Sequence, residues 1–212
     1  MRPDWVTISS LATAGGTLVL AVATFSAVRS ANRAARTSER SFLVGLRPVL
    51  FQSRRDDPTQ KIRWVDNHWA HVEGGRASIE SVDGVVYLAM SLRNGGSGIA
   101  VIQAWRAQRD EPSTNMVRPD PDDFSAQTRD MYVPAGDASF WQAAIREPDD
   151  RHRASVLEGV EGGSLMIDVL YSDHEGGQRT ISRFSIIRSP SGDSTWICSV
   201  VRHWNLDRRD PH

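Results

Sequence analysis

The residues best suited to chemistry form a short run of histidines and carboxylates in the first third of the chain. His68 and His71, with Asp66 and Glu73 nearby, are the densest collection of metal-ligand types in the sequence. Imidazole nitrogens and carboxylate oxygens are common ligands of zinc. On a continuous strand, Asp66 and His68 would share one face, and the other two would point to the opposite face. We therefore regard His68 and His71 as weak metal candidates, because one coordination shell would require a bend.

A second group of ligand types, Asp173, His174 and Glu175, is followed by two glycines. A polar hairpin loop explains these residues without any ion, because Asp and Gly are common turn formers. Asp173 and His174 are therefore also weak candidates, and we expect no metal and no cofactor. The alternative is a metal-dependent or hydrolytic enzyme that uses the His68/His71 region or the Asp173–Glu175 loop.

Two further features resemble reactive motifs. The stretch from Asn94 to Gly98 lacks the Lys-Ser/Thr of a nucleotide-binding loop, and no helical pattern follows it, which favours a sharp turn between strands. Cys198 is the only cysteine and lies in an apolar segment, whereas a nucleophilic thiol needs an accessible, electropositive setting. No serine lies in a nucleophile-elbow motif. We expect no catalytic residue and no enzymatic activity.

The end of the chain combines aromatic and charged residues after an apolar segment. Arg and Trp often anchor protein interfaces. The alternative is a closing strand whose ion-paired end covers the domain. The candidate partner-binding residues are Arg202, His203, Trp204, Arg208 and Arg209.

The element that precedes all these residues is an apolar N-terminal segment. Val6 to Val28 form 23 residues without a charge, enough to cross a bilayer as a helix. Several Ser and Thr residues make the segment less hydrophobic, but hydroxyls can hydrogen-bond to their own helix. We predict a retained transmembrane helix over residues 6–28 after a short tail, residues 1–5. The competing interpretation is a cleavable signal peptide, with Ala21-Val22-Ala23 resembling its cleavage site.

The flanking charges indicate an orientation. The end of a span that is richer in Lys and Arg tends to stay in the cytoplasm, and here that end is the C-terminal one. We predict a single-pass protein of a bacterial cell membrane, with its N-terminus outside and its β domain in the cytoplasm. An exported domain that binds envelope components would need the opposite orientation. The expected membrane-interface residues are Trp5, Arg29, Arg33, Arg36 and Arg40.

Charge is divided unevenly after the apolar segment. Residues 29–55 hold seven Arg against one Glu, whereas residues 56–212 hold 17 basic and 24 acidic residues. The basic part suits anionic lipid headgroups, and the acidic part is poorly suited to nucleic acid. We expect residues 29–47 to form a basic helical stalk that Pro48 ends. Ala12 and Gly16 place small residues on one helical face, which would allow a homo-oligomer.

Beyond Pro48 the hydrophobic period changes to two residues, which is typical of half-buried strands. The clearest cases are 85–93 and 165–171, and the second forms a hairpin with 179–187. Residues 110–129 are expected to be an exposed loop, and residues 149–157 a short helix. The remaining candidate strands are 49–53, 62–72, 99–108, 131–134, 138–145 and 195–204.

This strand spacing favours an antiparallel, two-sheet, immunoglobulin-like β-sandwich. We assign it to residues 48–207, followed by a short tail, residues 208–212. The 212-residue chain leaves roughly 160 residues for this domain, enough for a real core.

Three segments, Leu92–Ala100, Phe140–Gln142 and Arg202–Asp207, resemble those of small single-pass membrane proteins of high-GC bacteria. The resemblance covers most of the chain and implies one N-terminal transmembrane helix followed by a β-sandwich. It implies no activity and no catalytic residues. We therefore expect a membrane-tethered, non-enzymatic module that binds an unidentified protein partner or serves as an accessory subunit.

Overall fold

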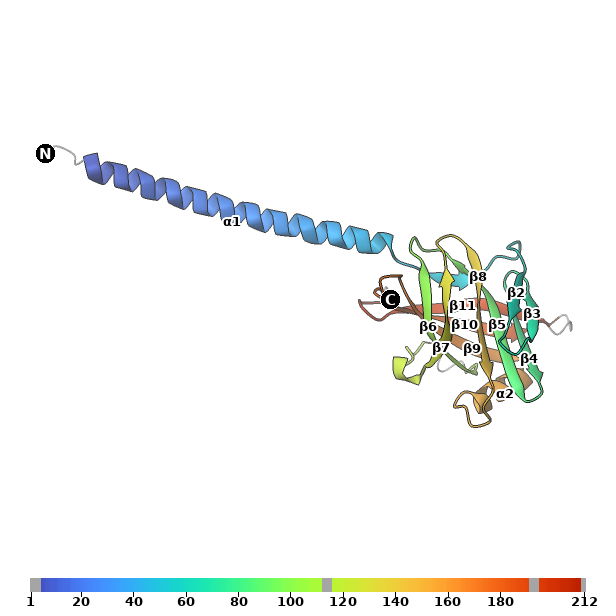
Figure 1. Cartoon of the computed structure of the whole chain (residues 1–212). Coiled ribbons are helices and arrows are strands. Elements are labelled where there is room, and N and C mark those ends of the chain that lie inside the picture. Colours follow the sequence, from blue (N-terminus) through green and yellow to red (C-terminus); the bar gives the residue numbers. More distant parts are fainter. Residues whose placement is uncertain (1–4, 112–115, 191–194, 211–212) are drawn as a thin grey trace. The chain divides into compact units, whose positions relative to one another are not determined.

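The computed structural model describes residues 5–111, 116–190 and 195–210, without the side chains of residues 5–8, 10–12, 40, 43 and 44. The chain divides into two compact units, residues 1–44 and residues 45–212 (Figure 1). The first unit is helical, and the second contains the β-strands.

Helix α1 (Trp5–Gly45) is a single helix of 41 residues. At 1.5 Å per residue it is about 60 Å long, roughly twice what a bilayer core requires. Its segment Thr13–Glu39 is long and apolar enough to cross a membrane, and none of it is buried in the protein. The helix continues through most of the predicted stalk and ends three residues before Pro48.

Hydroxyl groups along α1 are satisfied within the helix. Each donates to a main-chain carbonyl three or four residues earlier, at 2.8–3.0 Å. Such bonds lower the cost of placing a hydroxyl in hydrocarbon. The residues are Thr13, Thr17, Thr24, Ser26 and Thr37.

The described part of the β unit contains eleven strands, one α-helix and a 3-10 turn. In chain order they are β1 (Leu50–Gln52), β2 (Gln60–Arg63), β3 (Trp69–Val72), β4 (Arg76–Val82), β5 (Val85–Asn94), β6 (Ala100–Arg109), η2 (Pro121–Asp123), β7 (Ser125–Val133), β8 (Ala138–Ile145), α2 (Arg153–Gly162), β9 (Ser164–Ser172), β10 (Thr180–Arg188) and β11 (Trp196–Asn205).

Nine strands form one curled antiparallel sheet, and β2 and β3 form a separate hairpin. The sheet follows the order β1-β5-β4-β11-β10-β9-β6-β7, with β8 paired to β5, and it curls so that its strands lie in two crossing layers (Figure 1). Only two residue pairs, Ala77 with Trp196 and Arg76 with Ile197, join β4 to β11. The sheet therefore turns over at this short seam. The prediction of a mainly β, sandwich-like fold that follows one long helix in sequence is confirmed. Both layers belong to a single sheet.

The core lies between the layers, where alternate side chains of the strands meet. On β5 these are Val86, Leu88, Met90 and Leu92, all completely buried. The matching residues of β9 are Leu165, Ile167, Val169 and Tyr171. Helix α2 adds Val156 to the same cluster and covers one end of the strands (Figure 1). The core faces predicted for these two strands are confirmed.

The β2–β3 hairpin packs on the outer face of β5, so that both faces of this strand are covered. Ile62 and Trp64 contact Tyr87 and Ala89 in a second apolar cluster. The prediction of one strand over 62–72 was wrong. The chain turns between β2 and β3, where Asn67 adopts φ 63° and an Asp66 oxygen accepts the His68 N–H. Asn and Asp are the residues that tolerate such a turn.

Two other predicted boundaries were wrong. Strand β7 begins at Ser125, inside the predicted loop, because its exposed first half carries polar residues that hide the strand pattern. Helix α2 begins at Arg153, four residues later than predicted. Asp150 accepts the His152 N–H at 2.8 Å and holds a turn there instead.

A buried ion pair lies on the outer face of the β9–β10 layer. The Arg183 Nε and Nη2 atoms donate to the two Asp168 carboxylate oxygens at 2.6 and 2.9 Å, and both side chains are 1% exposed. The guanidinium carbon lies 4.8 Å from the centre of the Trp204 ring, and Nη1 donates to the Val117 carbonyl. The segment preceding β7 therefore covers the pair. Its Phe124 packs in one apolar cluster with Trp204.

This pair generates a stability prediction. Asp168→Ala removes the carboxylate that faces the buried Arg183 charge, and we expect it to lower the free energy of unfolding by about 3–5 kcal/mol. The double variant Asp168→Leu/Arg183→Met removes both charges and is expected to lose clearly less. Denaturant unfolding of the detergent-solubilised full chain, followed by tryptophan fluorescence, measures both. Equal losses in the single and double variants would contradict this account.

Candidate functional site

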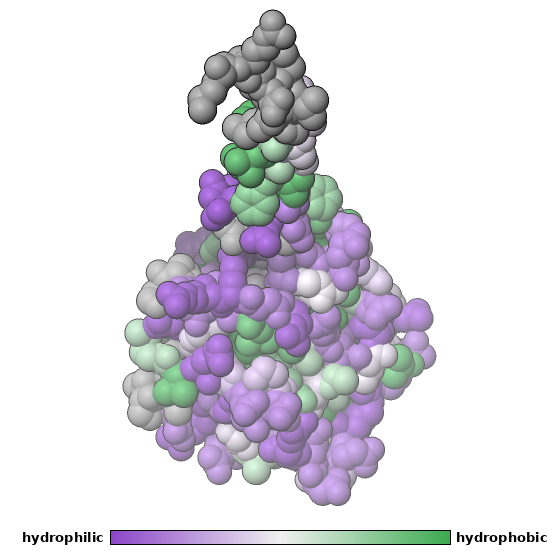
Figure 2. Space-filling model, turned by 90° about the vertical axis from the view of Figure 1, so that its left-hand side faces the viewer, coloured by the Kyte–Doolittle hydropathy of each residue, from purple (hydrophilic) through white to green (hydrophobic). Residues whose placement is uncertain are grey.

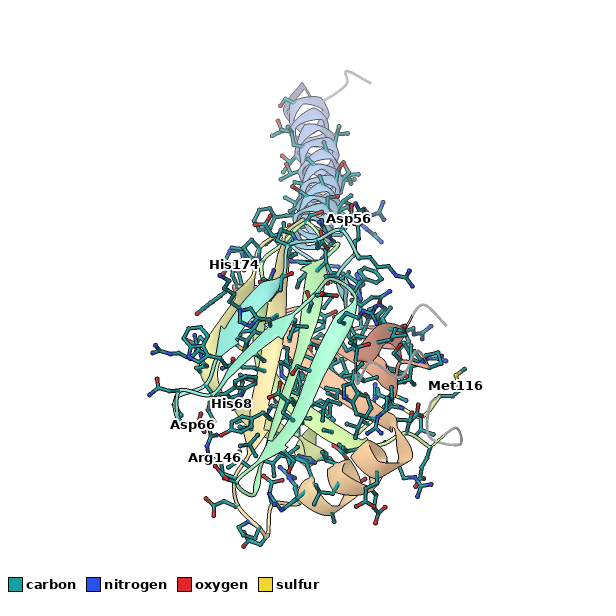
Figure 3. The ribbon with its side chains drawn as sticks, turned by 90° about the vertical axis from the view of Figure 1, so that its right-hand side faces the viewer. Asp56, Asp66, His68, Met116, Arg146 and His174 are labelled. Carbon is teal, nitrogen blue, oxygen red and sulfur yellow. The ribbon has the colours of Figure 1, made fainter. Side chains whose placement is uncertain are left out.

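His68 belongs to a compact polar cluster on the outer face of β5. Its Nε2 atom lies 3.0 Å from Glu80 Oε2, and its ring stacks on Tyr87 with centroids 3.9 Å apart. The Tyr87 hydroxyl donates to Asp66 Oδ2 at 2.7 Å, and Arg146 Nη2 donates to the same oxygen at 2.8 Å. Figure 3 shows Asp66, His68 and Arg146 close together. These contacts attach the β2–β3 turn to the curled sheet.

The four weak metal candidates are not brought together. His71 is exposed on β3, and His174 lies far from His68 (Figure 3). Asp173 accepts the N–H groups of Glu175 and Gly177 at 3.0 and 2.9 Å, as expected of a residue that shapes a hairpin loop. Within the described chain, no three His, Cys, Asp or Glu side chains form a metal-binding group.

The cluster around Asp66 generates a pH prediction. The Tyr87 hydrogen bond, assisted by Arg146, lowers the pKa of Asp66 to about 2 against the opposing effect of desolvation. A depressed folded-state pKa stabilises the protein above the unfolded-state pKa, near 3.8, and this stabilisation is lost as the pH falls toward 2. We expect the Tm advantage of the wild type over Asp66→Asn to shrink between pH 5 and pH 2. A Tm difference between the two proteins that is independent of pH would refute this prediction.

The five candidate partner-binding residues are divided between different environments. Trp204 is 3% exposed and packs on the outer face, where the Arg202 guanidinium lies 5.8 Å from its ring. His203 points to the other face, and its Nδ1 atom lies 2.7 Å from Ser182 Oγ. Arg208 and Arg209 are exposed beyond the end of β11. Trp204 therefore acts as a packing residue in this conformation, and Arg208 and Arg209 remain accessible.

All the candidate membrane-interface and oligomerisation residues lie on α1. The side chains of Trp5, Ala12 and Arg40 are outside the described set. Gly16 is exposed, and apart from its neighbours and the nearby backbone of α1 no described atom lies within 4 Å of the position that a Cβ would take there. Arg29, Arg33 and Arg36 are exposed on successive turns that follow the apolar part of the helix.

A serine and a histidine that the sequence did not single out meet where α2 covers the core. Ser125 Oγ lies 3.1 Å from His152 Nε2, and the His152 ring packs 5.0 Å from that of Trp105. Burial lowers the pKa of His152, which favours the neutral imidazole. Such a pair resembles a nucleophile and its base. Among the described residues, however, no group hydrogen-bonds the other ring nitrogen of His152 to orient it.

An arginine-lined pocket, also missed by the sequence analysis, lies where the segment after β1 meets the β3–β4 turn. Arg54, Arg55 and Arg76 line it. Gly74 makes the approach possible, because a Cβ at this position would lie 1.8 Å from the Arg54 carbonyl oxygen. The Gly75 N–H donates to Ser53 Oγ at 2.9 Å and fixes the turn. The sequence shows two adjacent arginines at 54 and 55, but Arg76 becomes their neighbour only in the folded chain.

The comparisons with known proteins assign no family. No known protein family matches the sequence, and no curated protein matches it. The resemblance drawn from sequence segments therefore gains no support, and the functional argument rests on the chain's own residues.

Proposed function

We propose that the chain is a single-pass membrane protein whose helix holds a non-enzymatic, β-sandwich binding module at the cytoplasmic face. The observation that carries the proposal is the exposure of apolar side chains on α1. Leu18, Val19, Leu20 and Phe25 are each 68% exposed. Figure 2 shows hydrophobic residues gathered on the helix and scattered over the visible face of the β unit. A bilayer would cover this apolar surface, which water favours burying at about 25 cal/mol per Å².

The orientation rests on the arginines. Arg29, Arg33 and Arg36 are exposed on the turns that follow the apolar residues, where a span meets its more basic flank. This flank tends to remain in the cytoplasm, and its charges suit the anionic headgroups of the inner leaflet. The β unit follows the basic flank in sequence and lies on the same side.

A binding or accessory role fits the polar clusters of the β unit. The groups around Asp66 and Asp173 hold turns in place, and the Ser125–His152 pair lacks an orienting group among the described residues. An unidentified protein partner, joined to this module at the membrane, is the expected ligand of the unit. The hydrolytic alternative would use Ser125 and His152 in place of the regions named from the sequence.

The orientation can be tested with a C-terminal tag. We expect the tagged β unit to resist protease in intact spheroplasts and to be digested after lysis, because the membrane encloses it. Resistance of the chain to extraction by alkaline carbonate, compared with a peripheral protein, verifies insertion. Digestion in intact spheroplasts would reverse the orientation and favour a domain that binds envelope components.

The binding role predicts a stoichiometric partner. Gentle solubilisation of membranes followed by purification of the tagged chain should recover the same partner protein repeatedly. If the exposed Arg208 and Arg209 contact this partner, Arg208→Ala/Arg209→Ala should recover less of it. Recovery of the chain alone would count against the proposal. Labelling by a serine-reactive fluorophosphonate, lost in Ser125→Ala, would favour the hydrolytic alternative.

A further inference from the structure

The arginine-lined pocket has the size and composition of a small binding site. Its volume is about 330 Å³, within the range of ligand pockets. It is lined by Arg54, Arg55 and Arg76, together with residues of the β3–β4 turn and of β11. A cavity that gathers three positive charges is a candidate site for a negatively charged group.

The three guanidinium groups have no direct carboxylate partner in the described part of the chain, although the charge of Asp57 acts on Arg54 at longer range. Among the described residues, none of the three guanidinium groups forms an ion pair within 4.0 Å. Asp57, three residues after Arg54, pairs with Arg93, whose guanidinium holds the pKa of that carboxyl below its usual range. Asp57 also accepts the Arg54 N–H at 2.7 Å, a main-chain contact that leaves the guanidinium unpaired.

The pocket is held by a rigid frame. Ser53 Oγ lies 2.7 Å from Ser91 Oγ and accepts the Gly75 N–H, while the Gly75 carbonyl accepts the Cys198 N–H at 3.0 Å. These bonds join four segments, namely the one after β1, the β3–β4 turn, β5 and β11. Because these bonds fix the backbone behind the arginines, that backbone needs little ordering on binding, which favours affinity.

Further hydrogen-bond donors belong to the lining of the pocket. Gln52 uses its Oε1 atom to accept the Val200 N–H at 2.9 Å, so its amide nitrogen remains as a donor. Arg76 Nη1 donates to Thr195 Oγ1 at 3.2 Å, and its other guanidinium nitrogens have no partner among the described residues. Donors surround the pocket, and the charged groups that line it are all cations.

We propose that this pocket binds a phosphate group carried as a monoester. Guanidinium groups pair with phosphate oxygens through parallel N–H donors, and three of them match a group with up to two negative charges and several acceptor oxygens. The source is either a lipid headgroup or a water-soluble phosphate compound. The inference goes beyond the binding module proposed above and holds for either orientation of the chain.

The test uses isothermal titration calorimetry of the full chain in nonionic detergent. The probes are inorganic phosphate and dihexanoyl phosphatidic acid, with sodium chloride at matched ionic strength and dihexanoyl phosphatidylcholine as controls for screening and for partition into micelles. We expect saturable binding of at least one probe and none of either control. Binding of phosphate indicates a soluble ligand, and binding of the acidic lipid alone indicates a headgroup.

Variants locate the site. Arg76→Gln is expected to weaken binding at least about tenfold, because it removes charged hydrogen bonds, and Arg54→Gln/Arg55→Gln/Arg76→Gln is expected to abolish it. Arg129→Gln removes the same charge from an exposed position of β7 outside the pocket and should bind as the wild type does. Thermal unfolding without probe checks the fold, and Arg76→Gln alone suffices if the triple variant unfolds. Absence of saturable binding, or an equal loss in Arg129→Gln, would overturn the proposal.

Discussion

The β unit depends on one buried amide at the end of β5. Asn94 is completely buried, and its Oδ1 atom accepts the N–H groups of Val49 and Gly96 at 3.1 and 2.9 Å. Its Nδ2 atom donates to the carbonyls of Gly98 and Val133 at 2.6 and 3.0 Å. The side chain thus uses its full capacity of two accepted and two donated hydrogen bonds. It joins the segment that enters the sheet, the loop after β5 and the end of β7, which no single backbone ladder connects.

The same junction requires glycines after Asn94. A Cβ at Gly98 would lie 1.7 Å from the carbonyl oxygen of Leu46, so no larger residue fits between the loop and the entering chain. The sequence correctly indicated that the glycine-rich stretch connects two strands. It did not reveal that the turn is shaped by the segment around Leu46, because that contact joins residues about fifty positions apart.

Strands with strict alternation, such as β5 and β9, were predictable because one side of each faces a dry core. The hairpin at Asn67 and the start of β7 were not predictable, because the polar side chains there shape a turn or face solvent. Candidate sites were harder still. His68 was noticed for its residue type, but its stacking on Tyr87 is a tertiary contact. Arg54 and Arg76 become neighbours only when the β3–β4 turn packs on the segment after β1.

The single thiol of the chain gives the sheet an internal reporter. Cys198 is buried between the layers, its sulfur 3.9 Å from that of Met90, and burial raises its pKa to about 12. At neutral pH the thiolate is therefore scarce, and reagents reach the sulfur only when the layers separate. The rate of alkylation at this position consequently measures how often the sandwich opens. A cysteine introduced on the exposed surface would react first, allowing selective labelling without removal of the native residue.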